Sequence, residues 1–392
     1  MYKILTLNNI AVEGLRHFPR ERYEVASEIT HPDAIILRSY NMHDMEIPET
    51  LAAVGRAGAG TNNIPVDALA HRGIPVFNAP GANANAVKEL ALAGLLIGAR
   101  NICEAAEYVK DLTETGDALE KAVEVGKKQF VGFELPGKTL GVIGLGAIGV
   151  EVANAALELG MKVVGFDPKM TVRNAWKMSA GVHQAETLDE LFQHADAVSC
   201  HVPLFDETRN MVNHDRLALM NHGAMLINFA RGGVVDDNAV VEALNSGKLH
   251  SYICDFPTAE LIANPNVISL PHLGASTGEA EENCAIMVAE NLKEYLENGN
   301  IRFSVNFPEC RLARMDAHRI TIANANVPNM VGQISTCLAD ARLNIEDLLN
   351  KSIGDLAYTI VDVNGPVTDE TMAQLRSIDG VLALRNLGPP VT

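Results

Sequence analysis

The chain has 392 residues, and at about 150 residues per domain this length predicts two or three domains. Its composition, 47% hydrophobic and 20% charged, is typical of a soluble globular protein and excludes a disordered or fibrous one. The 31 Lys and Arg against 49 Asp and Glu give a net charge of −18, which disfavours nucleic acids and anionic membrane surfaces as partners.

Short apolar, β-branched runs alternate with helical patterns through the first 80 or so residues. Such alternation predicts a parallel sheet covered by helices. A continuous helical pattern then runs from residue 83 to about 115, apolar at first and acidic later, and is expected to lead from one domain into the next. The strands predicted before it are 4–7, 34–37, 51–54 and 76–78, with a short helix at 66–71.

A second alternation predicts a larger parallel sheet. Its strands are expected at 139–144, 162–166, 197–202, 225–229, 252–255 and 267–270. An acidic helix at 277–297 is expected to return the chain to the first domain, and 306–314 has the pattern of a linker.

The remaining stretch predicts a small α+β domain. Its expected elements are strand 319–323, helix 330–341, strand 357–363, helix 369–378 and strand 381–387. The chain is therefore predicted to be α/β, with two doubly wound parallel-sheet domains and this third one. The expected domains are a discontinuous one made of 1–95 and 275–312, a Rossmann domain at 96–274, and a C-terminal domain at 317–392.

The strand at 139–144 leads into a glycine-rich turn, a helical pattern and a second strand that ends at Asp167. The glycines allow a tight turn and close approach of a pyrophosphate to the helix N-terminus, and the carboxylate can accept hydrogen bonds from a ribose. Because its charge would repel a 2′-phosphate, the pattern favours NAD over NADP. The alternative is a glycine-rich turn without a ligand. The residues predicted to bind the cofactor here are Gly144, Gly146, Ala147, Ile148, Gly149 and Asp167.

Three later segments stand at the ends of predicted strands, where an open α/β sheet places its ligands. They supply the guanidinium of Arg231, the carboxylate of Glu260 and the imidazole of His272. Oxidation of a 2-hydroxy acid needs a base for the hydroxyl proton, a partner for that base, and a cation for the substrate's carboxylate and carbonyl oxygens. Each alone has a simpler reading: a turn arginine, a solvated glutamate and a loop histidine.

Four ordered motifs, at 58–63, 144–149, 228–236 and 271–277, resemble those of the D-isomer-specific 2-hydroxyacid dehydrogenases over almost the whole chain. Within that family the likeness extends to members that oxidise D-3-phosphoglycerate to 3-phosphohydroxypyruvate at the start of serine biosynthesis. The resemblance implies an NAD-dependent enzyme of that kind. The alternatives are a dehydrogenase of glycerate, lactate or a related 2-oxo acid, a non-catalytic NAD-sensing interaction protein, and an amino-acid sensor.

By this resemblance His272 is the general base, Glu260 pairs with its imidazole, and Arg231 binds the substrate carboxylate and polarises the carbonyl. The family usually has Pro after this glutamate, whereas Leu261 stands here; Glu260 keeps its spacing of five from Asp255. Further residues expected around the nicotinamide are Phe229, Ala230, Asp255 and Gly274.

A phosphorylated substrate needs further cations, and the first domain offers Arg38, Arg56 and Arg72. Arg56 is preferred because it precedes a glycine-rich turn, where the backbone of Ala57 and Gly58 can meet a carboxylate. The alternative for Arg56 is an ion-pair or helix-end arginine.

The C-terminal stretch resembles an ACT domain, which implies edge-to-edge pairing in a homo-oligomer and a small amino acid such as L-serine as effector. The matching positions are Asn324, Asn326 and Asn344. The family usually has His or Lys at the first of these and Gly where Asn329 stands, so a purely oligomerising domain is the alternative.

The six cysteines show no C-x-x-C spacing, and most lie inside apolar stretches. They are predicted to be buried free thiols in a reducing compartment, the cytoplasm. The first eight residues have no export-signal pattern. No metal site is expected.

Overall fold

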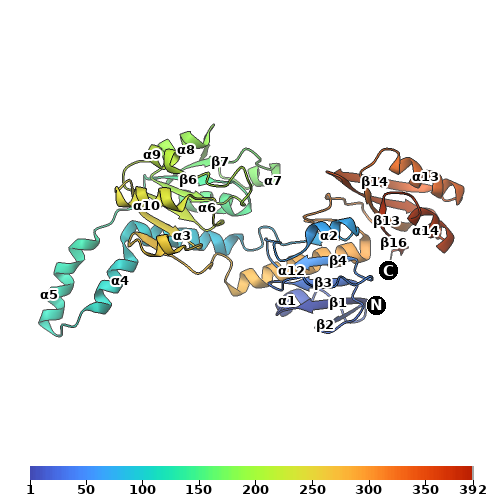
Figure 1. Ribbon diagram of the computed structural model, residues 1–392, viewed down its shortest axis with the longest axis horizontal. Helices are drawn as coiled ribbons and strands as arrows, with labels where there is room; N and C mark the ends of the chain where they lie inside the picture. The colour runs from blue at the N-terminus through green and yellow to red at the C-terminus, as the bar shows by residue number, and fades with distance from the viewer. Residues whose placement is uncertain (391–392) are drawn as a thin grey trace. The chain divides into compact units, whose positions relative to one another are not determined.

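The computed structural model describes residues 1–390, and the chain divides into two compact units. One unit combines Met1–Ala82 with the chain from Glu281 onward, and the other is Asn83–Ala280. Figure 1 shows the elements of each unit in chain order by colour. The second unit is thus inserted into the first.

The first unit contains a parallel sheet with strand order β2-β1-β3-β4-β5, which is a doubly wound arrangement. The strand predicted at 51–54 lies two residues too early: the observed strand begins at Ala53 and ends at Arg56. The edge strand β2 escaped prediction because its four residues alternate Tyr-Glu-Val-Ala without a sustained apolar run. The strands are β1 (Tyr2–Leu7), β2 (Tyr23–Ala26), β3 (Ala34–Leu37), β4 (Ala53–Arg56) and β5 (Val76–Phe77).

Helix α12 (Gly278–Asn298) packs on this sheet with α1 (Val12–Leu15), and α2 (Val66–His71) belongs to the same unit. Two glycines allow α12 to approach β4 and α1 closely. A Cβ on Gly55 would lie 2.4 Å from Val288 Cγ1, and one on Gly14 would lie 2.5 Å from the carbonyl carbon of Ala285. The helix therefore rests directly on the strand that carries Arg56.

The C-terminal part forms an antiparallel sheet of order β14-β15-β13-β16 with α13 (Met330–Asp340) and α14 (Asp369–Arg376) packed on one face. This arrangement is consistent with the predicted ACT-like domain. Strand β14 was missed, because it is an edge strand whose sequence mixes apolar and polar residues and is nowhere fully buried. The strands are β13 (His318–Ala325), β14 (Ile345–Ile353), β15 (Leu356–Val363) and β16 (Val381–Gly388).

The second unit contains a larger parallel sheet of order β12-β11-β10-β9-β6-β7-β8. This is the Rossmann order, with its switch point between β6 and β9, so the predicted fold class is confirmed. The strands are β6 (Thr139–Ile143), β7 (Lys162–Phe166), β8 (Val182–Gln184), β9 (Ala197–Cys200), β10 (Ala224–Asn228), β11 (Leu249–Cys254) and β12 (Val267–Ser269).

Helices cover both faces of this sheet. One core joins the sheet to α3 (Ala84–Arg100) and α6 (Ala147–Glu158). The other joins it to α8 (Leu188–His194), α9 (His214–Leu219) and α10 (Asp237–Asn245). The short helices α7 (Val172–Ala175) and α11 (Ala259–Ile262) lie in the connections after β7 and β11.

The continuous helix predicted from 83 to about 115 is wrong, because the chain breaks at Asn101. This residue has φ 51°, in the left-handed region that Asn tolerates better than most residues. A hydrogen bond of 2.9 Å joins its Oδ1 to His250 Nε2, and this long-range contact fixes the break.

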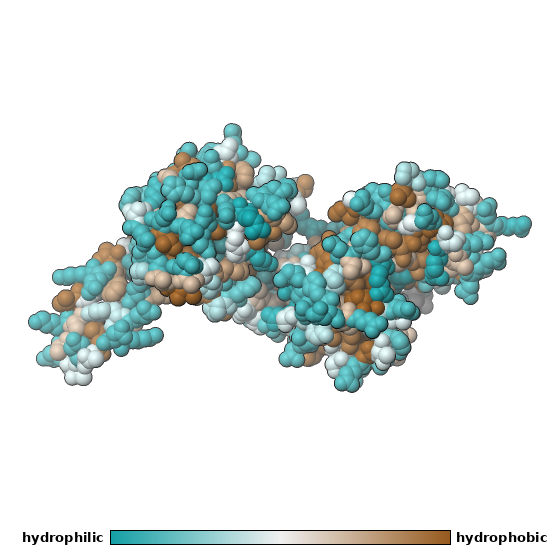
Figure 2. Space-filling view, viewed as in Figure 1, coloured by the Kyte–Doolittle hydropathy of each residue, from teal (hydrophilic) through white to brown (hydrophobic). Residues whose placement is uncertain are grey.

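Beyond Asn101 the chain forms a helical hairpin of α4 (Ile102–Asp111) and α5 (Asp117–Gly126), followed by η1 (Lys127–Phe130). The hairpin extends from the rest of its unit (Figure 1). Figure 2 shows hydrophilic residues mixed with apolar ones over its surface, and Ile102 and Val109 are about half exposed. Among residues 1–390, no helix is both long and apolar enough to span a membrane.

Candidate active site

Candidate residues lie in both units. In the second unit, the turn between β6 and α6 holds the glycine fingerprint. Gly144 has φ 88°, and a Cβ on Gly149 would lie 1.9 Å from the carbonyl oxygen of Gly144, so neither position accepts a side chain. No atom lies within 4 Å of a Cβ built on Gly146, which leaves space for a ligand beside the N–H groups of Ala147 and Ile148.

Asp167 follows β7 and lies beside this turn. Its Oδ2 accepts a hydrogen bond of 2.9 Å from the Leu145 N–H, and its Oδ1 accepts one of 2.8 Å from the Lys169 N–H. The carboxylate is thereby fixed next to the turn at which a pyrophosphate would sit. This is the position in which the sequence pattern places the ribose acceptor.

His201 was not singled out from the sequence, although it follows β9 at the switch point of the sheet. Its carbonyl oxygen would lie 2.8 Å from a Cβ on Gly144, and its Nε2 lies 2.8 Å from Ser199 Oγ. Its Nδ1 is buried and has no hydrogen-bond partner among the described residues. Burial lowers the pKa of His201 to about 4, so the imidazole is neutral near pH 7. From the sequence, His201 fell inside the strand predicted at 197–202, so no sequence signal marked it; the observed strand ends one residue before it.

We expect the stability of the protein to fall as the pH drops from about 6.5 to about 4, in part because of His201. The unfolded chain binds a proton near pH 6.5 and the folded chain only near pH 4, so acid favours unfolding across this window. At about 1.4 kcal/mol per pKa unit the contribution is about 3 kcal/mol. Urea denaturation at pH 7 and pH 4.5 measures it. A His201→Asn variant should lose less stability on acidification than the native protein, and an equal loss in both would contradict this origin.

The turn after β10 presents Arg231. Asn228, which is 1% exposed, donates from Nδ2 to the Arg231 carbonyl oxygen at 2.9 Å and accepts from the Ala230 N–H at 3.1 Å. Phe229 is buried against Gly94 of α3. The Arg231 side chain is exposed, and its Nη1 donates to the Ala230 carbonyl oxygen at 2.7 Å. Asn228 therefore shapes the turn, a role that the sequence did not reveal.

Asp255 and the His272 loop meet after β11 and β12. Asp255 is 2% exposed, and its Oδ2 accepts a hydrogen bond of 2.8 Å from the Gly274 N–H. Its Oδ1 is buried without a partner among the described residues, so it can accept from a ligand. His272 itself has φ 56°, and its ring centroid lies 5.0 Å from that of Phe256. The loop that carries His272 is thus bonded to Asp255 through Gly274.

The expected pair of Glu260 with His272 is not formed in this structure. Glu260 is exposed in the first turn of α11, and within residues 1–390 neither a hydrogen bond nor an ion pair joins the two side chains. The following residue, Leu261, is completely buried, and this orients the helix so that the carboxylate faces outward. The catalytic role of Glu260 stays a prediction.

In the first unit, the structure brings together two of the three candidate cations for the substrate. Arg56 Nε donates to the Arg38 carbonyl oxygen at 3.1 Å, and its side chain lies across Gly58, where a Cβ would be 1.9 Å from Nη1. Arg38 Nη1 forms an ion pair of 2.5 Å with Glu281. Arg72 instead donates to the carbonyl oxygens of the 47–48 loop, at 2.9 and 3.0 Å.

A cavity of about 150 Å³ lies at the turn between β13 and α13. Asn324 and Asn326 line it, together with Asn350, which the sequence did not single out. Asn350 Nδ2 donates to Thr359 Oγ1 at 2.7 Å, and Thr359 Oγ1 donates to Asn324 Oδ1 at 3.3 Å. Asn344 does not line this cavity and instead donates from its Nδ2 to Glu346 Oε1 at 3.3 Å.

Neither the cysteines nor the acidic residues form a metal site. Within the described residues, no group of three or more His, Cys, Asp or Glu is placed to hold a metal ion. All six cysteines are free, as predicted, and four of them are buried.

Comparison with known proteins agrees with the family that the sequence motifs resemble. Residues 92–274 match the family model "D-isomer specific 2-hydroxyacid dehydrogenase, NAD binding domain". The chain is 36% identical over 88% of its length to D-3-phosphoglycerate dehydrogenase of Haemophilus influenzae, covering 83% of that protein. It is 35% identical over 87% of its length to the enzyme of the same name from Methanocaldococcus jannaschii, of which it covers only 63%.

Among solved structures, the NAD⁺-bound 3-phosphoglycerate dehydrogenase of Entamoeba histolytica is 25% identical, with a TM-score of 0.60. The similarity covers 78% of this chain and 98% of that chain.

Proposed function

Since this chain belongs to the D-isomer-specific 2-hydroxyacid dehydrogenases, an NAD-binding enzyme family, we propose that it oxidises D-3-phosphoglycerate to 3-phosphohydroxypyruvate, the first step of serine biosynthesis. The observation that carries the choice of substrate is the Arg56 side chain, which lies across the Gly58 turn of the first unit and donates to the Arg38 carbonyl oxygen. Its guanidinium fits an anionic group of a substrate that carries a phosphate besides its carboxylate. The relatives named D-3-phosphoglycerate dehydrogenase support the same choice of substrate.

The residues of the second unit fit an NAD molecule. The open space at Gly146 and the helix N-terminus behind it suit a pyrophosphate, and Asp167 suits the adenosine ribose. The unpartnered Oδ1 of Asp255 suits an amide N–H of the nicotinamide. When bound, NAD supplies the acceptor for the hydride from substrate C2.

The chain's own residues would then accept the hydroxyl proton and stabilise the negative charge of the substrate. His272 accepts the proton of the C2 hydroxyl, and the left-handed backbone of its loop is held by the bond from Gly274 to Asp255. Arg231 binds the substrate carboxylate and stabilises the developing carbonyl, with its turn shaped by Asn228. In this proposal Glu260 supports the imidazole by bonding it, a contact that its exposed carboxylate does not make in this structure.

Replacing Asp167 with Ala should weaken NAD binding by about 10-fold or more, because the ribose hydroxyls lose a charged acceptor. The variant should also lose its discrimination against NADP, since no carboxylate remains to repel the 2′-phosphate. Titration of both reduced cofactors by fluorescence measures the two dissociation constants. Asp167 also holds the Leu145 N–H, so a thermal melt checks that the turn is intact. Unchanged NAD affinity in a folded variant would contradict this role.

We propose that the cavity at Asn324 binds a small amino acid, L-serine in the first instance, and that the protein is a homo-oligomer. The cavity volume of about 150 Å³ and its amide lining fit a ligand of that size and polarity. The edge strands β14 and β16 leave the C-terminal sheet open to pairing with a second copy. Asn324, Asn326 and Asn350, which line the cavity, would provide the polar contacts to this amino acid.

Steady-state kinetics with D-3-phosphoglycerate, glycerate and D-lactate, with and without L-serine, tests the whole proposal. We expect kcat/KM to favour the phosphorylated acid by at least about 10-fold, the equivalent of one good charged contact. Equal rates with the three acids would instead indicate another 2-hydroxyacid dehydrogenase. Tight NADH binding without turnover of any acid would indicate an NAD sensor. If serine changes neither rate nor oligomer size, the effector proposal is wrong.

A further inference from the structure

Helix α12 ends against the C-terminal sheet, whose side chains bind the carbonyl groups of its last turn. Arg385 donates from Nη1 to the Tyr295 oxygen at 2.9 Å and from Nη2 to the Leu296 oxygen at 2.8 Å. Just beyond the helix, the Tyr358 hydroxyl donates to the Gly299 oxygen at 2.8 Å. The last carbonyls of a helix have no partner within it and carry a negative partial charge, so cationic donors stabilise this end.

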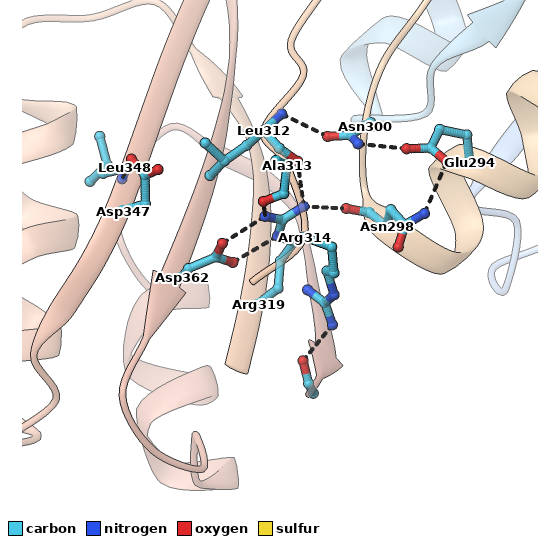
Figure 3. Close-up of polar contacts among 11 residues, drawn as sticks. Glu294, Asn298, Asn300, Leu312, Ala313, Arg314, Arg319, Asp347, Leu348 and Asp362 are labelled. Carbon is cyan, nitrogen blue, oxygen red and sulfur yellow. Dashed lines mark hydrogen bonds and ion pairs between the residues drawn. The ribbon is translucent and has the colours of Figure 1, made fainter. Parts of the chain in front are cut away.

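Arg319 adds the strongest of these contacts and is itself completely buried. It binds both carboxylate oxygens of Asp362, at 2.7 and 2.6 Å (Figure 3). Its other donors reach the carbonyl oxygens of Asn298 at 3.0 Å, Leu312 at 3.0 Å and Ala313 at 2.8 Å. The five guanidinium N–H groups therefore all have acceptors, and the buried charge is paired.

These contacts also hold residues 306–314, which the sequence predicted as a linker. This segment forms a bridge in which the N–H and carbonyl groups of Ile301 and Cys310 bond each other, at 2.8 and 3.1 Å. With Leu312 and Ala313 bound to Arg319, the segment is fixed between the two sheets of the unit.

Apolar side chains also join the C-terminal sheet to the rest of its unit. Tyr358 and Ile360 of β15 share one core with Leu292 and Leu296 of α12. A Cβ on Gly299 would lie 2.3 Å from Thr321 Cγ2. The C-terminal sheet and α12 thus share one buried core.

The same helix supports both candidate substrate cations. Near its N-terminal end, Glu281 pairs with Arg38 at 2.5 Å. In its middle, Val288 packs beneath Gly55, the residue before Arg56. One helix of 21 residues therefore joins the C-terminal sheet to the candidate substrate site of the same unit.

We propose that the C-terminal sheet is a fixed part of the first unit, and that Arg319, Tyr358 and Arg385, the α12 clamp, position Arg38 and Arg56 through helix α12. These three are positioning residues. A ligand of the sheet then acts by tightening or loosening α12, and the sheet does not swing as a separate domain. The α12 clamp follows from these contacts alone, whereas the positioning of the substrate cations rests on the proposed function.

Hydrogen exchange of the full chain tests the clamp without reference to activity. Two mild variants, Tyr358→Phe and Arg385→Met, each remove one set of bonds. We expect the amides around residues 295–301 to exchange at least about 10-fold faster in both, since each lost bond is worth about one tenfold step in local opening. Arg376→Met is the matched control, because Arg376 is an exposed arginine of the same sheet domain and bonds no described side chain. Unchanged exchange in both variants would show that the sheet is an independent module.

Kinetics of the same variants tests the positioning. We expect the KM for D-3-phosphoglycerate to rise about 3- to 10-fold while kcat changes less than about twofold, because looser cations weaken substrate binding and leave the reacting groups of the other unit in place. NADH affinity should not change. Faster exchange with an unaltered KM would refute the positioning. If the native protein turns over no acid, the proposed function fails while the exchange result still decides the clamp.

Discussion

Replacing His272 with Ala should lower kcat by about 10²- to 10⁴-fold, the range that a positioned general base contributes. His272 is the imidazole that the loop after β12 presents, and its removal takes away the side chain proposed to accept the hydroxyl proton. Cofactor affinity should stay within about twofold, because the glycine turn and Asp167 are untouched. Stopped-flow measurement of NADH formation and fluorescence titration of NADH give the two quantities.

The matched control is His183→Ala, which removes an exposed histidine from the edge strand β8 of the same sheet. It should retain full activity. If His272→Ala kept its turnover, the assignment of the base would be wrong and the NAD-sensor alternative would gain support. If it lost NADH binding together with turnover, the loop would have a structural role instead.

Replacing Arg231 with Gln should reduce kcat/KM by about 10²- to 10³-fold, comparable to the loss of one preorganised donor to a developing oxyanion. The Arg231 side chain is exposed in the turn after β10, and Asn228 fixes this turn by donating one hydrogen bond and accepting another. Arg231→Lys should restore only part of the loss, because an ammonium cannot bind a carboxylate with two parallel bonds. Steady-state kinetics of both variants with D-3-phosphoglycerate measures the effect.

Arg209→Gln is the control for charge alone, since Arg209 is an exposed arginine close to the same turn at Gly233. It should change kcat/KM by less than about threefold, as expected for a screened surface charge. Equal losses in the two Gln variants would indicate a general electrostatic effect. An unchanged kcat/KM in Arg231→Gln would exclude the carboxylate-binding role.

The sequence by itself determined the cofactor turn and most strands of the two parallel sheets, because their signals are local; the edge strands β2 and β8 were not predicted. Buried parallel strands are continuous apolar runs, and the turn at 144–149 is encoded in glycines whose lack of a Cβ is required within a few residues. Strand, turn, helix, strand and Asp167 follow in order along about 30 residues of chain, as is usual for this βαβ unit. The same regularity placed Arg231, Asp255 and His272 at consecutive strand ends.

Tertiary structure decided the features that depend on partners distant in the chain. The break at Asn101 needs His250, 149 residues away, and the edge strand β14 needs β15, since its own pattern is not apolar. Leu261 is buried in α11 while Glu260 beside it is exposed and makes no bond to His272, which the spacing of the motif did not show. Arg319 gave no sequence signal, because a buried arginine is stable only where Asp362 and the carbonyls of Asn298, Leu312 and Ala313 converge on it. Local pattern selects which elements form, whereas these contacts are made only after the sheets have packed.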